Sequence, residues 1–247
     1  MQTHFLAYFV VSLLGLIAGT FSGVVGTGSS LILMPALVYL FGPKEAVPIM
    51  AVAAILANLA RVAVWRREID WRACAAYSVT GIPAAACGAR TLLALPPRLI
   101  EGGLGLFFLA MIPARHWLAK HALRLNLWHL ALGGAVIGYL TGIVVTTGPI
   151  NVPLFLSYGL AKGAFLATEA ASSLGVYLSK AAVFRSFGAL PWSLAAKGCL
   201  IGLSLMAGQV IAKHLVLKLS EAAFRRIMDG LMLASGATLL CAAWVRG

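Results

Sequence analysis

The sequence predicts an all-α polytopic membrane protein made of two inverted repeats, each consisting of a broken helical hairpin and three transmembrane helices. Three observations predict this fold class. Of the 247 residues, 61% are hydrophobic and only 11% are charged, which is too little charge for the surface of a soluble domain. Apolar segments recur along the chain in two series of five. Each series begins with a glycine-rich helix that breaks before a short second helix.

The ten apolar segments follow one another without a long polar linker, so we expect a single transmembrane domain over residues 1–247. A helix needs about 20 residues to span a bilayer. On this basis the first series covers roughly 5–25, 29–41, 45–65, 72–94 and 98–114, and the second roughly 128–146, 149–160, 164–184, 192–215 and 223–245. We expect repeat 1 at about 1–116, a basic cytoplasmic linker at about 115–126 and repeat 2 at about 127–247.

The two series share landmarks at matching distances, which indicates an internal duplication. A proline lies in the short second segment of each series, at Pro35 and Pro153. Gly23 precedes Pro35 by 12 residues and Gly142 precedes Pro153 by 11, while Ala46 and Ala164 follow these prolines by 11. Further along each series a tryptophan is followed after ten residues by a glycine, at Trp71–Gly81 and Trp192–Gly202.

The placement of basic residues favours opposite orientations for the two repeats. Lys and Arg concentrate in cytoplasmic loops. The basic loop at 66–72 and the basic linker lie two spans apart, so both can be cytoplasmic if each hairpin returns to its starting side. The basic residues at 213–226 then also lie inside, and both termini lie outside. In the alternative, each hairpin makes a net crossing and residues 213–226 lie outside.

The first broken hairpin contains the candidate site. Glycines at every fourth position, Gly15, Gly19 and Gly23, line one helical face and predict close helix packing. The sequence then reads Gly-Thr-Gly-Ser-Ser at 26–30, which predicts a helix break; the second break falls at 146–151. A break inside a membrane must be buried or line a polar cavity, and transporters bind their substrates at such breaks.

We expect the two breaks to meet and to bind an anion. Each short helix begins at its break, so its unpaired N–H groups and the positive end of its dipole would point into the site. Side chains with hydroxyl and amide groups could donate further hydrogen bonds. In the alternative, the same residues only cap and pack the helices. The predicted substrate-binding residues are Gly26, Thr27, Gly28, Ser29, Ser30, Thr146, Thr147, Gly148, Asn151, Asn58, Arg61 and Ser172.

Two ionisable residues within apolar segments have alternative roles. Asn58 and Arg61 are three residues apart and therefore share a helix face. Arg61 either extends to the membrane surface or attracts the anion. A carboxylate at Glu169 is costly in an apolar segment, so it needs a polar cavity or a basic partner. Glu169 is the coupling candidate, as a proton carrier; the alternative is a structural ion pair with Lys162 or Lys180.

Several function classes are disfavoured by composition and motifs. The net charge of +12 comes from Lys and Arg between apolar segments, as expected for membrane topology, so we expect no nucleic-acid partner. The four cysteines and five histidines show no paired spacing, so no metal site is predicted. The nucleotide-binding patterns GxGxxG and GxxxxGK[ST] are absent. We expect no cofactor, and no nucleophile or metal constellation indicates an enzyme.

The glycine ladder that enters the run from Gly26 to Pro35, and its repeat around Gly142 to Pro153, resemble the TauE/SafE sulfite/sulfonate exporter family. The resemblance extends over nearly the whole chain. It implies a multi-pass protein of the cell inner (plasma) membrane that moves sulfite, organosulfonates or related anions. Members of the family often have a run of glycines at the break, where this chain has more hydroxyl groups, so the resemblance implies the fold more strongly than the substrate.

These observations predict a secondary transporter, most simply an exporter, of sulfite, organosulfonate or a related small sulfur-containing anion. Alternating access would expose a substrate held between the two broken hairpins. The alternatives are an anion channel, an uptake transporter for another organic anion and, with less support, a membrane-embedded enzyme. The expected partners are the small anionic substrate and the lipid bilayer; proton coupling and homodimerisation stay open.

Overall fold

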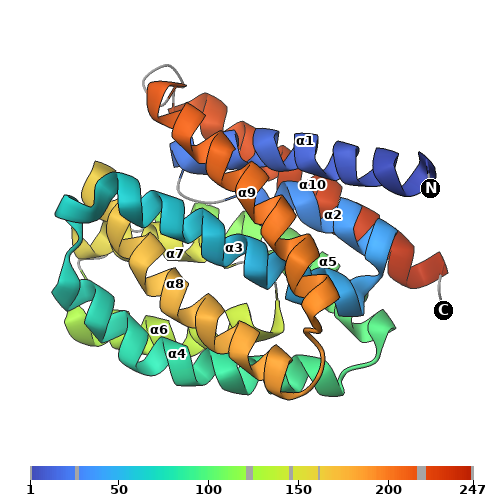
Figure 1. The fold of residues 1–247 in the computed structure, drawn as a ribbon. Coiled ribbons are helices and arrows are strands. Elements are labelled where there is room, and N and C mark those ends of the chain that lie inside the picture. Colours follow the sequence, from blue (N-terminus) through green and yellow to red (C-terminus); the bar gives the residue numbers. More distant parts are fainter. Residues whose placement is uncertain are drawn as a thin grey trace.

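The computed structural model describes residues 2–25, 28–120, 125–144, 147–160, 162–215 and 221–245. Within these ranges the chain is helical and contains no strand (Figure 1). The first half contains α1 (Gln2–Val25), α2 (Ser29–Phe41), α3 (Pro43–Trp65), the 3-10 helix η1 (Arg66–Glu68), α4 (Trp71–Ala94) and α5 (Pro97–Lys120). The second half contains α6 (Leu127–Ile143), α7 (Gly148–Tyr158), α8 (Lys162–Ser186), α9 (Trp192–Leu215) and α10 (Glu221–Val245).

The all-α fold class is confirmed, and each predicted segment corresponds to one helix, but two predicted boundaries are wrong. Helix α5 continues to Lys120 instead of ending near residue 114, so the expected linker begins inside a helix. Its polar end is built from Arg, Leu, Ala and Lys, which are good helix formers, so polarity alone does not end it. Helix α6 ends at Ile143, before a β-branched run at 143–147 that has low helix propensity.

Each half begins with two helices separated by a break. In the first half α1 ends at Val25 and α2 starts at Ser29. Gly28 precedes α2 with a φ of 111°, a left-handed conformation that favours glycine. In the second half α6 ends at Ile143 and α7 starts at Gly148. Both predicted breaks are present, but the second lies earlier than the expected 146–151, because α6 ends at Ile143 and residues 148–151 already belong to α7. Pro35 and Pro153 lie inside the short helices that follow the breaks.

Helix packing corresponds between the two halves when they are exchanged. Helix α1 packs on α9 of the other half, and α6 packs on α4. In the same way α3 packs on α9 and α8 on α4, while α2 contacts α10 and α7 contacts α5. The third helices, α3 and α8, also pack directly on each other. The long helices of each half therefore pack mainly on helices of the other half.

Glycine ladders permit the closest of these contacts. A Cβ on Gly19 would overlap the carbonyl oxygen of Leu205 in α9, and a Cβ on Gly138 would overlap that of Gly81 in α4. The packing role predicted for the glycine face of α1 is confirmed, and α6 carries a matching ladder. The two ladders are Gly15, Gly19 and Gly23 in α1, and Gly134, Gly138 and Gly142 in α6.

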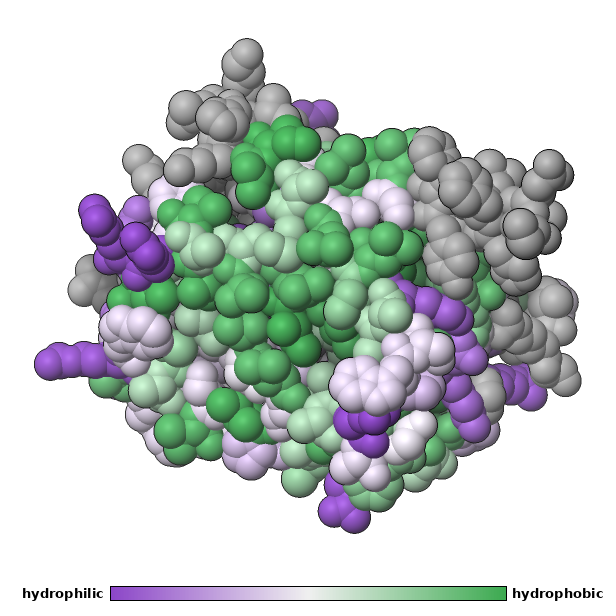
Figure 2. Space-filling model, viewed as in Figure 1, coloured by the Kyte–Doolittle hydropathy of each residue, from purple (hydrophilic) through white to green (hydrophobic). Residues whose placement is uncertain are grey.

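The long helices run across the view of Figure 1, and equivalent turns of the two halves lie at opposite ends. The α3–α4 turn, through η1, lies at the left edge, whereas the α8–α9 turn lies at the lower right. Hydrophobic residues cover the middle of the visible face in Figure 2, and most hydrophilic residues lie toward its left and right edges. By length and hydropathy alone, Pro43–Glu68 and Trp192–Ala212 are candidate membrane spans among the described residues.

Candidate functional site

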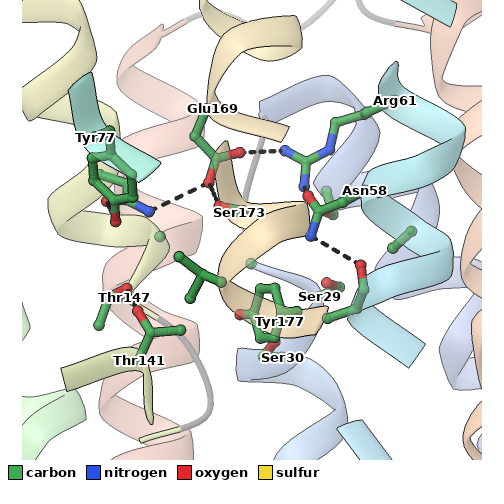
Figure 3. A pocket seen from close by; sticks show the side chains of 17 residues that line it. Ser29, Ser30, Asn58, Arg61, Tyr77, Thr141, Thr147, Glu169, Ser173 and Tyr177 are labelled. Carbon is green, nitrogen blue, oxygen red and sulfur yellow. Dashed lines mark hydrogen bonds and ion pairs between the residues drawn. The ribbon is translucent and has the colours of Figure 1, made fainter. Parts of the chain in front are cut away.

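Both helix breaks open onto one cavity in the interior of the helix bundle. The space in it that a water-sized sphere can occupy is about 30 Å³, so the cavity is narrow in this conformation. Gly28, Ser29 and Ser30 line it at the start of α2, and Thr147 and Gly148 line it at the start of α7. Figure 3 shows side chains from these breaks and from α3, α4, α6 and α8 surrounding the space. Two helix N-termini, separated widely in sequence, therefore contribute to a single site.

The polar centre of the cavity is an ion pair between α3 and α8. Arg61 Nη1 lies 3.0 Å from Glu169 Oε2. Both residues are buried, with 7% and 4% of their surfaces exposed. Arg61 also donates from Nη2 to the Asn58 side-chain oxygen at 2.7 Å, and the Asn58 amide donates to the carbonyl oxygen of Ala54 at 2.9 Å. The guanidinium is thereby held toward the cavity.

The Glu169 carboxylate accepts hydrogen bonds from two further side chains. Ser173, one turn along α8, donates to Oε1 at 2.8 Å, and the Asn151 amide donates to the same oxygen at 3.4 Å. The phenol of Tyr77 donates to the Asn151 side-chain oxygen at 3.0 Å, which orients the amide nitrogen toward Glu169. Helices α3, α4, α7 and α8 therefore meet in one hydrogen-bonded network (Figure 3).

The hydroxyl groups of the two breaks differ in their environment. Thr147 is hydrogen-bonded to Thr141, near the end of α6. The first break presents two serines: Ser29 and Ser30 lie at the start of α2 and line the cavity, and the first N–H groups of a helix have no partner within it. Ser22 in α1 also lines the cavity, and its buried hydroxyl has no hydrogen-bond partner within the described ranges. Among the described residues, the first break therefore has more hydroxyl donors facing the cavity.

A buried lysine on α8 stabilises the end of α6, at the second break. Lys180 in α8 is fully buried, and its ammonium donates to the carbonyl oxygens of Thr141 at 2.6 Å and Val144 at 2.8 Å. These carbonyls lie where α6 ends and loses its own N–H partners. The positive charge also opposes the negative end of the α6 dipole.

Most of the predicted site residues come together. The cavity is lined by Gly28, Ser29, Ser30, Asn58, Arg61, Thr147, Gly148, Asn151 and Glu169. Ser172 does not line it, because its side chain is turned by about 100° around α8 from that of Ser173; its hydroxyl donates to the carbonyl of Thr168 in the preceding turn at 2.8 Å. Gly26, Thr27 and Thr146 lie outside the described residues.

The expected partners of two ionisable groups need correction. Glu169 pairs with Arg61, and the ammonium of Lys180, one of its two expected partners, instead bonds backbone carbonyls. The side chain of the other, Lys162, lies outside the described part of the chain. Arg61 does not extend to the membrane surface, because Asn58 and Glu169 hold it in the interior.

The sequence analysis missed Tyr77 and Ser173. Ser173 lies four residues after Glu169 and therefore on the same helix face, a spacing that could have identified it. Tyr77 lies on α4 and reaches the site only because α4 packs on α8, which no local pattern in the sequence indicates. Tyr177, also missed, lines the cavity from α8.

The sequence of the chain was compared with those of known protein families. The sequence model of the family described as "Sulfite exporter TauE/SafE" matches residues 11–239. The chain belongs to this family. The TauE/SafE proteins are a family of membrane transporters, so membrane transport and membrane localisation follow for this member. No curated protein and no solved structure matches the chain.

Proposed function

We propose that this TauE/SafE protein is a multi-pass secondary transporter of the cell inner membrane. It exports sulfite, an organosulfonate or a related small sulfur-containing anion by alternating access. The substrate binds in the cavity between the two helix breaks. Within the described residues, the Arg61 guanidinium and the starts of α2 and α7 supply the positive potential of this site.

The observation that carries this proposal is that two helix N-termini and a buried arginine converge on one cavity. The N-terminus of an α-helix carries about half a positive charge and offers unpaired N–H donors, so it favours an anion. A sulfite or sulfonate group has three oxygens that accept hydrogen bonds in three directions. Donor side chains at Ser29 and Ser30 on α2, at Asn151 on α7 and at Arg61 on α3 approach the cavity from three different helices.

An inverted arrangement of the two halves supports alternating access. Helix packing is preserved when the halves are exchanged, and the equivalent α3–α4 and α8–α9 turns lie at opposite ends of the bundle (Figure 1). Helix α2 runs back toward the edge at which α1 begins, as expected if the hairpin returns to its starting side (Figure 1). Inverted repeats with substrate at helix breaks let the halves rock around a central site.

Transport is tested with the purified full-length protein in liposomes. We expect saturable uptake of radiolabelled sulfite or of a small organosulfonate, and stimulation by unlabelled substrate on the opposite side of the membrane. A carboxylate of similar size should compete poorly, because it has two oxygens for three groups of donors. Protein-free liposomes provide the baseline.

Different outcomes would support different functions. Equal flux with and without protein for every oxyanion tested would refute the proposal. Flux that does not saturate and shows no counterflow would identify an anion channel. Transport assays on inside-out and right-side-out vesicles would separate export from uptake.

A further inference from the structure

The cavity already contains an anion that belongs to the protein. We propose that the Glu169 carboxylate is a resident anion, occupying the place at Arg61 that the substrate takes, and that the substrate binds together with one proton on Glu169. This inference rests on the proposed function, since it takes the cavity as an anion site. It adds the coupling ion and the residue that carries it.

The donors around Glu169 are those that an oxyanion requires. Oε2 lies 3.0 Å from Arg61 Nη1, while Oε1 accepts from Ser173 at 2.8 Å and from Asn151 at 3.4 Å. A guanidinium, a hydroxyl and an amide thus converge on one buried carboxylate from three helices. Asn151 lies in the first turns of α7, beside the second break. A substrate held at the helix starts would therefore compete with Glu169 for Arg61 and Asn151, whereas Ser173 lies one turn from Glu169 on the same helix and serves the carboxylate alone.

Charge balance argues that a proton accompanies the substrate. Of the helices packed on α8, α3 directs Arg61 and α4 directs Tyr77 toward Glu169, whereas α6 and α7 contribute neutral side chains to the cavity. The charged residues of η1 are exposed. Among the described residues that line the cavity, Arg61 is the only cationic one. An ionised Glu169 already balances it.

A bound monovalent anion would add a second negative charge opposite one guanidinium. Two like charges in a buried site repel each other strongly. Lys180 lies three turns further along α8, and its ammonium bonds the carbonyls that end α6, so its charge is engaged there. A proton on Glu169 removes the excess charge and leaves a neutral carboxyl group that still hydrogen-bonds to its neighbours. One anion and one proton therefore bind as a unit.

The experiment measures the binding of methanesulfonate to purified protein at pH 6 and pH 8. A sulfonate is chosen because, unlike sulfite, it keeps the same charge across this range. If one proton binds with each anion, affinity rises about tenfold for each unit that the pH falls. Calorimetry in two buffers of different ionisation enthalpy should also give an uptake of close to one proton. Both effects should disappear in Glu169→Gln.

A matched control separates the buried carboxylate from acidic residues in general. Glu45→Gln removes a carboxylate that pairs with Lys197 at 3.6 Å near the surface. This variant should keep the pH dependence and the proton uptake of the wild type. Ser173→Ala keeps every charge but removes one donor to Glu169, so it should release the resident anion more easily and bind methanesulfonate several-fold more tightly.

The outcomes are distinguishable. Binding of methanesulfonate without proton uptake, or an unchanged pH dependence in Glu169→Gln, would overturn the inference and leave the proposed anion site intact. Weaker binding by Ser173→Ala would overturn it too, and this variant can be tested even if Glu169→Gln does not fold. Failure of the wild type to bind or transport any oxyanion at either pH would instead refute the proposed function.

Discussion

The ammonium nitrogen of Lys180 lies 2.6 Å from the carbonyl oxygen of Thr141. A side chain of α8 therefore donates the hydrogen bond that a further turn of α6 would have supplied to this carbonyl. A second carbonyl, that of Val144, accepts from the same nitrogen at 2.8 Å. In a membrane the carbonyls exposed by a break cannot be satisfied by lipid. The second break is therefore stabilised by a charged side chain and not only by its own residues.

Replacing Lys180 by methionine should destabilise the protein strongly. Methionine has a similar length but no donor, so two buried carbonyls would lose their partner. A buried polar group without a partner costs about 1–3 kcal/mol. For two carbonyls we expect the free energy of unfolding in detergent to fall by about 2–6 kcal/mol. The control is Lys197→Met, which removes a partly exposed surface pair with Glu45 worth up to about 1 kcal/mol. Equal stability of the two variants would contradict the role assigned to Lys180.

A methyl group on the glycine ladder of α6 should separate α6 from α4. In Gly138→Ala the new Cβ would overlap the carbonyl oxygen of Gly81, which belongs to a backbone and cannot move alone. Overpacking of this kind costs about 1–3 kcal/mol. Gly103→Ala is the matched control, because a Cβ there meets nothing within 4 Å. We expect a lower thermal midpoint for Gly138→Ala only; the packing role would be wrong if both variants unfold alike.

Arg61→Gln should abolish most of the anion affinity. The substitution removes the cationic side chain of the described cavity lining and a hydrogen bond to a charged group, which is worth about 1.5–3 kcal/mol. We therefore expect the dissociation constant for a sulfonate to rise by about tenfold to a hundredfold. Arg90→Gln is the control, since Arg90 lies over the ring of Phe187 outside the cavity. An unchanged dissociation constant in Arg61→Gln would contradict the site.

The double variant Arg61→Gln/Glu169→Gln should be more stable than Arg61→Gln alone. The single variant leaves a buried carboxylate without its ion-pair partner, which costs about 3–5 kcal/mol, whereas removing both charges avoids this cost. Thermal unfolding should therefore recover in the double variant while anion binding does not. Recovery of binding as well would indicate that Arg61 only neutralises Glu169 and makes no contact with the substrate.

Removal of the Tyr77 hydroxyl should affect the network through Asn151. In Tyr77→Phe the buried Asn151 side-chain oxygen loses its donor, and we expect a loss of about 1–3 kcal/mol in unfolding free energy. Tyr139→Phe is the control, because its hydroxyl contacts Thr91 at 3.2 Å in an exposed position. Surface substitutions of this kind usually change stability by less than about 0.5 kcal/mol. Similar losses in both variants would exclude a special role for Tyr77.

The sequence predicted the helix breaks well because their signals are local. Glycine and hydroxyl residues at 26–30, followed by an apolar run, indicate a break wherever the segment is placed. The site partners were harder to predict, since Arg61 and Glu169 lie 108 residues apart and meet only through the packing of α3 on α8. The cavity is lined by Ser173 and not by the predicted Ser172, which shows how far the sequence alone can place a side chain on a helix. One residue turns a side chain by about 100° around a helix, and only the four-residue spacing from Glu169 to Ser173 indicates which of the two serines faces the cavity.

Because α1 of the first half packs on α9 of the second, the two halves cannot assemble one after the other. The ribosome completes α1 long before its packing partner α9, so the glycine face of α1 must wait in the bilayer without the neighbour that fits it. Helix α2, by contrast, can fold back as soon as it is made. The described lining of the anion cavity is complete only once α8 has been inserted, because its last residue is Tyr177. A truncated product that ends after the first half would contain one helix break, an Arg61 without Glu169 and an uncovered glycine ladder.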